Sequence, residues 1–274
     1  MSILEAIVLG VVQGITEFLP ISSTAHLRII PAFAGWEDPG AAFTAVTQLG
    51  TMAAVLLFFR EDLLRVARTW LASLRRPELR HELDARMGWY LILGTIPIAI
   101  FGLLFENQIE TGARDLVLMG ITLILLGFVL LAAERTGRRT REISDLTLRD
   151  GLIVGCAQAV ALIPGVSRSG ATITAGLFLG FERAAAARFS FLLSVPAVVL
   201  SGAFELYGIA SGEKSDQTGT VALIVATAVA FVAGYAAIAF LLRFLATHTT
   251  GVFVAYRVIL GIVVLALVAA GVIA

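Results

Sequence analysis

Residues 13–26 read Gln-Gly-Ile-Thr-Glu-Phe-Leu-Pro-Ile-Ser-Ser-Thr-Ala-His, a polar run inside an otherwise apolar segment that extends from 3 to 30. Pro20 lacks a backbone donor and clashes with the preceding turn, so the pattern predicts a helix, a break and a second helix. A second apolar segment, 151–180, is interrupted in the same way at Pro164. The sequence therefore predicts two broken helical segments.

The composition places the chain in a membrane. Of its 274 residues, 58% are hydrophobic and 15% are charged, and the mean hydropathy is +0.93. Soluble domains are about 45–50% apolar and about 25% charged. The formal net charge is zero, which gives no indication of nucleic-acid binding.

A spanning helix needs about 20 predominantly apolar residues. Besides the two broken segments, six stretches meet this requirement: 41–59, 88–105, 115–133, 189–208, 220–242 and 253–273. We expect an all-α integral membrane protein, a single domain over 1–274, with six transmembrane helices and two re-entrant helical hairpins.

The two broken segments resemble each other, because residues 10–13 (Gly-Val-Val-Gln) align with residues 155–158 (Gly-Cys-Ala-Gln). Each broken segment is followed by three spans, which predicts two repeats, 1–140 and 145–274. An odd number of spans in each repeat turns the second upside down. Broken segments in corresponding positions of inverted repeats indicate a binding site near the middle of the membrane.

The arginines indicate the orientation. Seven lie in the predicted loop 60–86 and five in the predicted loop 134–150. Four more flank two turns expected on the same side: Arg183, Arg188, Arg243 and Arg257. The opposite side has only Arg28, Arg114 and Lys214, the last in a predicted exposed connector, Gly212–Thr220. Because basic residues favour the cytoplasmic side, both termini are expected to face outward.

The first broken segment brings several reactive side chains together. Gln13 and Glu17 are four residues apart and share a helix face, and Ser23 and His26, three apart, share another. Ser22 or Ser23 can cap the second helix. A carboxylate inside a membrane costs around 3 kcal/mol on some scales, so Glu17 is a candidate functional residue.

The second broken segment contains, over residues 164–172, Pro-Gly-Val-Ser-Arg-Ser-Gly-Ala-Thr. Gly165 frees the backbone, and Ser167 can cap the helix that follows. Arg168 in the first turn is unfavourable for the helix dipole unless an anion is also bound. Free backbone N–H groups, hydroxyls and an arginine together are typical of a phosphate site. A salt bridge between Arg168 and Glu17 is a structural alternative that is compatible with this function.

The two elements together predict phosphoryl transfer, which depends mainly on positioning and charge stabilisation. Arg168 would hold phosphate oxygens and Glu17 would hold a divalent cation. Either Ser23 attacks phosphorus or His26 activates a water molecule, and the sequence leaves both open. The candidate phosphate-binding residues are Ser22, Thr24, Ser167, Ser169 and Thr172, supported by Gln13 and Gln48. For Ser22, Ser23 and Thr24 the structural alternative is a polar cluster that satisfies the backbone freed at the proline break.

At these elements the chain resembles the undecaprenyl-diphosphate phosphatase family of bacterial membranes. Residues 13–17 match its Glu/Gln-x-x-x-Glu motif, residues 20–26 match Pro-x-Ser-Ser-Thr-x-His, and residues 164–172 match Pro-Gly-x-Ser-Arg-Ser-x-x-Thr. Where relatives have Glu at the first motif position, this chain has Gln13. The acidic role then falls to Glu17 alone.

The resemblance implies six spanning helices and two re-entrant hairpins in an inverted repeat, with a homodimer in many members. It implies dephosphorylation of the C55 polyprenyl diphosphate to the monophosphate with Mg²⁺ or Ca²⁺, at a site opening to the outer face of the bacterial inner membrane. It also implies a role in cell-wall synthesis and bacitracin resistance. The alternative is a transporter or flippase of a phosphorylated lipid, because paired re-entrant hairpins are also transporter architecture.

Overall fold

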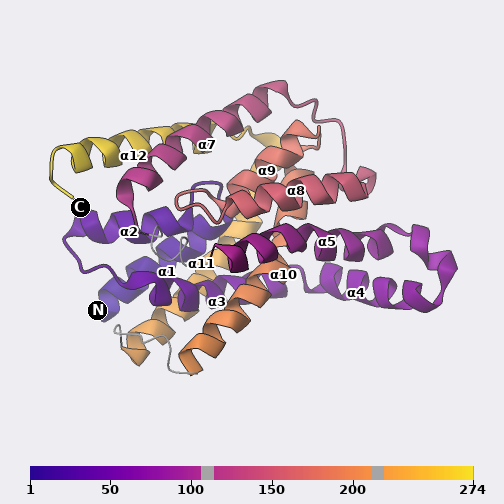
Figure 1. Ribbon diagram of the computed structural model, residues 1–274, viewed down its shortest axis with the longest axis horizontal. Helices are drawn as coiled ribbons and strands as arrows, with labels where there is room; N and C mark the ends of the chain where they lie inside the picture. Colours follow the sequence, from indigo (N-terminus) through magenta and orange to yellow (C-terminus); the bar gives the residue numbers. More distant parts are fainter. Residues whose placement is uncertain (106–113, 211–218, 274) are drawn as a thin grey trace.

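The computed structural model describes residues 1–105, 114–210 and 219–273 (Figure 1). These residues are almost entirely helical, as the sequence predicts. In chain order the helices are α1 (Ile3–Phe18), α2 (Ser23–Ala34), α3 (Gly40–Phe58), α4 (Arg60–Arg75), α5 (Leu83–Leu104), α7 (Leu116–Thr136), α8 (Leu148–Val160), α9 (Arg168–Phe178), α10 (Arg183–Ala210), α11 (Thr220–Thr247) and α12 (Gly251–Ala269). Two 3-10 turns, η1 (Pro77–His81) and η2 (Ile143–Asp145), complete the described elements.

Five helices are long and apolar enough to cross a bilayer, namely α5, α7, α10, α11 and α12. A sixth span results if α3 and α4, which are bent by 72° at their junction, count as one. Large apolar side chains such as Leu103, Val221 and Val232 project outward from these helices. An extended apolar exterior is expected where lipid replaces water. All six predicted spans coincide with helices.

The segment 60–86, predicted as a loop, is instead mainly the helix α4 followed by η1. Val66 is buried on one face of α4, whereas Leu64 and Leu71 are exposed. Acidic residues in its first turn and Arg75 in its last turn complement the helix dipole. The prediction of a loop was wrong because it followed the arginine content and not the helical spacing of the apolar residues.

Both predicted breaks are present. The first separates α1 from α2 at residues 19–22, and the second separates α8 from α9 at residues 161–167. Ser22 caps α2 by accepting the Ala25 N–H at 3.4 Å, and Ser167 caps α9 by accepting the Gly170 N–H at 3.0 Å. Because α1 packs against α2 and α8 against α9, each broken segment is a helical hairpin.

The two hairpins are held by close contacts with long helices. Helix α1 packs along α11 and α8 along α5, while α7 lies beside α12 (Figure 1). A Cβ at Gly14 would lie 2.5 Å from the Ala233 Cβ, and one at Gly155 would lie 2.2 Å from the Gly94 carbonyl oxygen. Small residues therefore allow these helices to approach closely, as is common between membrane helices.

Arg257, predicted to flank a cytoplasmic turn, is instead buried in the protein, with 1% of its surface exposed. It lies almost two turns inside α12 and points inward, so the prediction from its charge alone was wrong. The predicted connector Gly212–Thr220 lies outside the described residues except for its last two.

Candidate active site

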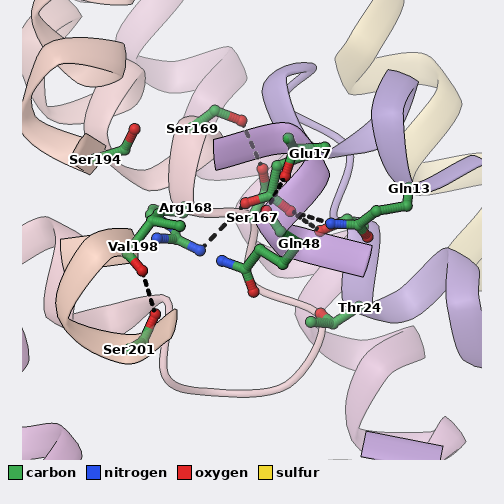
Figure 2. A network of polar contacts seen from close by, with 12 residues as sticks. Gln13, Glu17, Thr24, Gln48, Ser167, Arg168, Ser169, Ser194, Val198 and Ser201 are labelled. Carbon is green, nitrogen blue, oxygen red and sulfur yellow. Dashed lines mark hydrogen bonds and ion pairs between the residues drawn. The ribbon is translucent and has the colours of Figure 1, made fainter. Parts of the chain in front are cut away.

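Glu17, in the last turn of α1, is the centre of a polar cluster (Figure 2). Its Oε2 accepts a hydrogen bond from Ser23 Oγ at 2.6 Å and another from Gln13 Nε2 at 3.2 Å. Its Oε1 accepts one from Arg168 at 3.2 Å. The Pro20 break makes this possible, because it turns α2 so that Ser23 faces back toward α1.

Arg168 is the first residue of α9 and carries its charge into the cluster from the second hairpin. The Arg168–Glu17 ion pair joins residues that are 151 positions apart in the chain. The two side chains are 20% and 11% exposed, so the pair is neither buried completely nor fully accessible. The cluster therefore stands at the junction of the two breaks, where a polar ligand could replace one ion-pair partner.

The hydroxyls of the second break point mainly into the protein. Ser167 and Ser169 both donate to the Leu19 carbonyl oxygen, at 3.4 and 3.0 Å, and so connect the two breaks. Thr172 lies 2.5 Å from the Ser190 hydroxyl on α10. The structure thus brings Ser167 and Ser169 to the junction but turns Thr172 away from Glu17.

The remaining hydroxyls near the first break belong to Ser22 and Thr24, the neighbours of Ser23 in the chain. Ser22 and Thr24 share a hydrogen bond of 3.2 Å between their hydroxyl oxygens. Thr24 is exposed and Ser22 is buried. Thr24 is therefore accessible to a ligand, whereas the Ser22 hydroxyl is used as a helix cap.

His26 faces away from the cluster. Its Nδ1 lies 2.6 Å from the Ser22 carbonyl oxygen and its Nε2 lies 2.6 Å from the Tyr256 hydroxyl on α12. Among the described residues it makes no hydrogen bond to Glu17, Ser23 or Arg168. The helical spacing of Ser23 and His26 does not bring their side chains together here.

Gln48 on α3 lines a cavity of about 90 Å³ between α3 and α10. Its other lining residues are Ala45, Leu49, Val198, Ser201 and Gly202. Figure 2 shows Gln48, Val198 and Ser201 in the same view as the Arg168–Glu17 pair. Gln48 thus contributes a polar side chain to the wall of a small cavity between these two helices.

Sequence reasoning missed two residues of α12 as site residues: Tyr256, which contacts His26 on α2, and Arg257, which contacts both breaks. Arg257 donates to the carbonyl oxygens of Pro20 at 3.1 Å and Gly165 at 3.5 Å, one in each break. It also donates to two carbonyls of α7, those of Thr122 and Leu123. The available signal was a basic residue inside a predicted span, which usually has a function. Tyr256 had no comparable signal.

The cluster can accommodate a divalent cation only with few protein ligands. No group of three or more His, Cys, Asp or Glu side chains in the described part of the chain could hold a metal ion. However, Gln13 Oε1 is buried beside Glu17 without a hydrogen-bond partner among those residues. One carboxylate and one amide oxygen, with phosphate oxygens and water, suit Mg²⁺, which commonly takes few protein ligands.

The chain is similar to known proteins over its whole length. Residues 6–263 match the family model described as bacitracin resistance protein BacA. A protein of Thermobifida fusca is 56% identical over 99% of this chain and 92% of its own length, and one of Nocardioides sp. is 56% identical over 99% and 98%. A protein of Mycolicibacterium smegmatis is 55% identical over 100% and 99%. All three carry the name undecaprenyl-diphosphatase. By this match in sequence and motif, the chain belongs to the BacA family.

Proposed function

We propose that this protein hydrolyses undecaprenyl diphosphate to undecaprenyl monophosphate and inorganic phosphate. It thereby recycles the lipid carrier of cell-wall synthesis and confers resistance to bacitracin. The observation that supports this function is the position of the Glu17 carboxylate, between the Ser23 hydroxyl and the Arg168 guanidinium. A base, a nucleophile and an anion-binding cation are the groups that phosphoryl transfer requires.

The geometry favours Ser23 as the nucleophile. Ser23 Oγ attacks the terminal phosphorus while its proton passes to Glu17 Oε2, 2.6 Å away. The bond between phosphorus and the bridging oxygen breaks, and the lipid monophosphate leaves. Water then attacks the phosphoserine, Glu17 returns its proton to Ser23 Oγ, and the proton lost by water leaves on inorganic phosphate. His26 takes part in neither step, because its two ring nitrogens face the Ser22 carbonyl oxygen and the Tyr256 hydroxyl.

Arg168 stabilises the negative charge that develops on the transferred phosphoryl group. Its ion pair with Glu17 opens when the diphosphate enters, and the backbone N–H groups at the start of α9 supply further donors. Mg²⁺ or Ca²⁺ would be held by Glu17 and the unpartnered Gln13 Oε1. The cation would neutralise charge on the diphosphate oxygens.

We also infer that the chain is an inverted repeat in the bacterial inner membrane, with six spans and two re-entrant hairpins. Three observations support this arrangement. The first hairpin packs on α11 and the second on α5, which occupy corresponding places in the two halves. Both termini lie toward the left end of Figure 1, and the arginine-rich connections from α4 to α5 and from α7 to α8 lie toward the right end. From the positive-inside rule we then expect the termini to face outward, and we propose that the site opens to the same side.

The decisive experiment is phosphate release in detergent, where no separate compartments exist and transport cannot be observed. Purified protein with Mg²⁺ or Ca²⁺ is expected to release phosphate from undecaprenyl diphosphate. Glu17→Ala and Arg168→Ala should each reduce turnover about 100-fold or more, the range for removing a charge-stabilising group. Arg60→Lys is the control, because Arg60 is exposed and, within the described residues, its side chain pairs with Glu61 and donates to the Leu57 carbonyl oxygen.

Full turnover in both alanine variants would exclude this site, although the enzyme could still be a phosphatase. Absence of phosphate release from the folded wild-type protein would exclude the activity itself. Binding of the diphosphate without release would then favour a transporter or flippase.

A further inference from the structure

We propose that Tyr256 is a positioning residue of the active site. Its hydroxyl fixes His26, His26 holds the strained backbone at Ser22, and that backbone places the adjacent Ser23 hydroxyl against Glu17. This inference deepens the proposed function and rests on it. It assigns to Tyr256 and His26 a role in holding the nucleophile, with no proton transfer to substrate.

The backbone at Ser22 needs to be held. Ser22 has φ of 75° and ψ of 100°, a conformation that residues with a side chain rarely adopt. Such a conformation is unfavourable and persists only where its surroundings fix it. Because Ser23 is the next residue, relaxation at Ser22 would move the Ser23 hydroxyl away from Glu17.

His26 supplies the first restraint. The Ser22 carbonyl oxygen lies 2.6 Å from His26 Nδ1 and also accepts the His26 backbone N–H at 3.3 Å. A carbonyl can only accept a hydrogen bond, so Nδ1 must carry a proton. The side chain and the backbone of one residue therefore hold the same oxygen.

Tyr256 supplies the second restraint by selecting the tautomer. Its hydroxyl lies 2.6 Å from His26 Nε2, and the two rings are nearly parallel, at 7°. With the proton on Nδ1, the Nε2 of a neutral imidazole accepts, so Tyr256 donates. A hydrogen bond at one ring nitrogen sets which tautomer is present at the other.

The surroundings of His26 favour the neutral form. The imidazole is 4% exposed, and the charged group that acts on it from α12 is Arg257, a cation. Glu17, the carboxylate of the site, accepts hydrogen bonds from Gln13, Ser23 and Arg168. Within the described residues it makes none with His26. Both ring nitrogens of His26 are thus occupied, and neither is available to a water molecule.

Two substitutions of His26 separate positioning from proton transfer. In His26→Asn the amide nitrogen takes the place of Nδ1 and can still donate to the Ser22 carbonyl. In His26→Gln the amide lies near the former Nε2, and this donor is lost. If His26 acts by positioning, His26→Asn should retain turnover within about tenfold of wild type. This factor corresponds to the loss of one hydrogen bond, the one from Tyr256, at about 1.4 kcal/mol. On the same basis, turnover of His26→Gln should fall well below that of His26→Asn.

If His26 transferred protons, the asparagine and glutamine variants would be equally impaired, by roughly 10²–10⁴-fold. The limb of the pH profile that depends on histidine would also disappear in both. Either result would overturn the inference. Under positioning, the pH profile of His26→Asn keeps the shape of the wild-type profile and only its height changes.

Tyr256→Phe tests the tyrosine directly. It removes only the hydroxyl, and we expect kcat to fall about tenfold, since one hydrogen bond is lost, with little change in KM. Tyr235→Phe is the matched control. Tyr235 is also a partly exposed tyrosine of a long helix, and its ring packs on Phe58 while its hydroxyl makes no hydrogen bond within the described residues. Equal kcat in Tyr256→Phe and wild type would contradict the inference.

A spectroscopic measurement makes the test independent of activity. The chain has only three histidines, so the ring-nitrogen signals of His26 can be identified by their loss in His26→Asn. Nitrogen NMR should show a neutral ring protonated at Nδ1 in wild type and a mixture of tautomers in Tyr256→Phe. A ring protonated at Nε2 in wild type would overturn the inference, whereas an inactive wild-type protein with the expected tautomer would overturn only the proposed function.

Discussion

Ser23 Oγ donates to Glu17 Oε2 at 2.6 Å, across the break that separates α1 from α2. The contact joins a hydroxyl to a carboxylate with no histidine between them. It therefore resembles a nucleophile with its general base more closely than a water-activating site. The contact depends on the break itself, because in a continuous helix residues six positions apart lie on different faces.

The first prediction concerns this nucleophile. Ser23→Ala should lower kcat about a thousandfold or more, as expected when a member of a nucleophile–base unit is removed. Acid quenching of wild-type protein during turnover of a diphosphate labelled in its terminal phosphate should leave label on Ser23, detectable by mass spectrometry. Ser194→Ala is the control, because within the described part of the chain the Ser194 hydroxyl donates to the Phe191 carbonyl oxygen of its own helix. Near-normal turnover in Ser23→Ala would instead favour direct attack by water.

The second prediction concerns the cation. Chelation should abolish turnover of the wild-type protein, and Mg²⁺ or Ca²⁺ should restore it. Gln13→Glu would place a second carboxylate beside Glu17, which should lower the Mg²⁺ concentration for half-maximal activity about tenfold, because affinity follows the charge of the ligands. Turnover at limiting Mg²⁺ and calorimetric binding of Mg²⁺ without substrate measure this. An unchanged Mg²⁺ requirement would show that Gln13 does not contact the cation.

The sequence was sufficient to predict the long apolar helices and the two breaks, for identifiable physical reasons. Long apolar runs admit few structures other than helices in a membrane. Proline disfavours a continuous helix, and Pro20 and Pro164 lie in the two breaks, whereas Pro97 and Pro196 lie inside α5 and α10. The polar residues beside Pro20 and Pro164 therefore distinguish the breaks from a proline within a span. The helix α4 was missed because its charged residues also fit an exposed loop, and the helical spacing of its apolar residues, with Val66 on the buried face, was not used.

The candidate site could be predicted only in part. The motifs indicated Glu17, Ser23 and Arg168, which share the cluster because both breaks carry polar residues. They did not indicate which hydroxyls turn inward. Thr172 hydrogen-bonds to Ser190 on α10, and no local sequence pattern predicts that α10 packs beside Thr172. From α12, about 90 residues downstream of the second break, Tyr256 contacts His26 and Arg257 contacts both breaks. Spacing along the chain does not reveal this relationship.

The third prediction concerns Arg257, which binds carbonyl oxygens of both breaks. Arg257→Met should lower stability in detergent by at least about 2–3 kcal/mol, because each buried carbonyl left without a partner costs about 1–3 kcal/mol. Arg257→Lys keeps the charge but lacks the planar fork of donors, so it should be intermediate. Thermal unfolding measures the loss. Arg243→Met is the control, because Arg243 is exposed on α11. Equal losses in the two methionine variants would show that Arg257 does not hold the breaks.

The fourth prediction concerns the pH dependence of stability that Asp150 contributes. Asp150 precedes the apolar part of α8 and accepts hydrogen bonds from Arg141 at 2.6 Å and from the Thr147 hydroxyl at 2.7 Å. Burial alone would raise the pKa of Asp150, but the hydrogen bonds from Arg141 and Thr147 outweigh it, so the pKa lies below the usual value. The Asp150 hydrogen bond likewise raises the pKa of Arg141.

A carboxylate whose pKa is lower in the folded state stabilises the protein above its unfolded pKa, and that contribution is lost as the pH falls through the folded pKa. Wild-type protein should therefore melt above Asp150→Asn by a constant margin from about pH 7 to about pH 5, and the margin should shrink at lower pH. Asp115→Asn is the control, because Asn caps a helix nearly as well as Asp and Asp115 serves α7 in that way. A margin that stays constant down to about pH 3.5 would mean that Asp150 titrates alike in the folded and unfolded chains, and that its ion pair with Arg141 contributes nothing to the stability of the second hairpin.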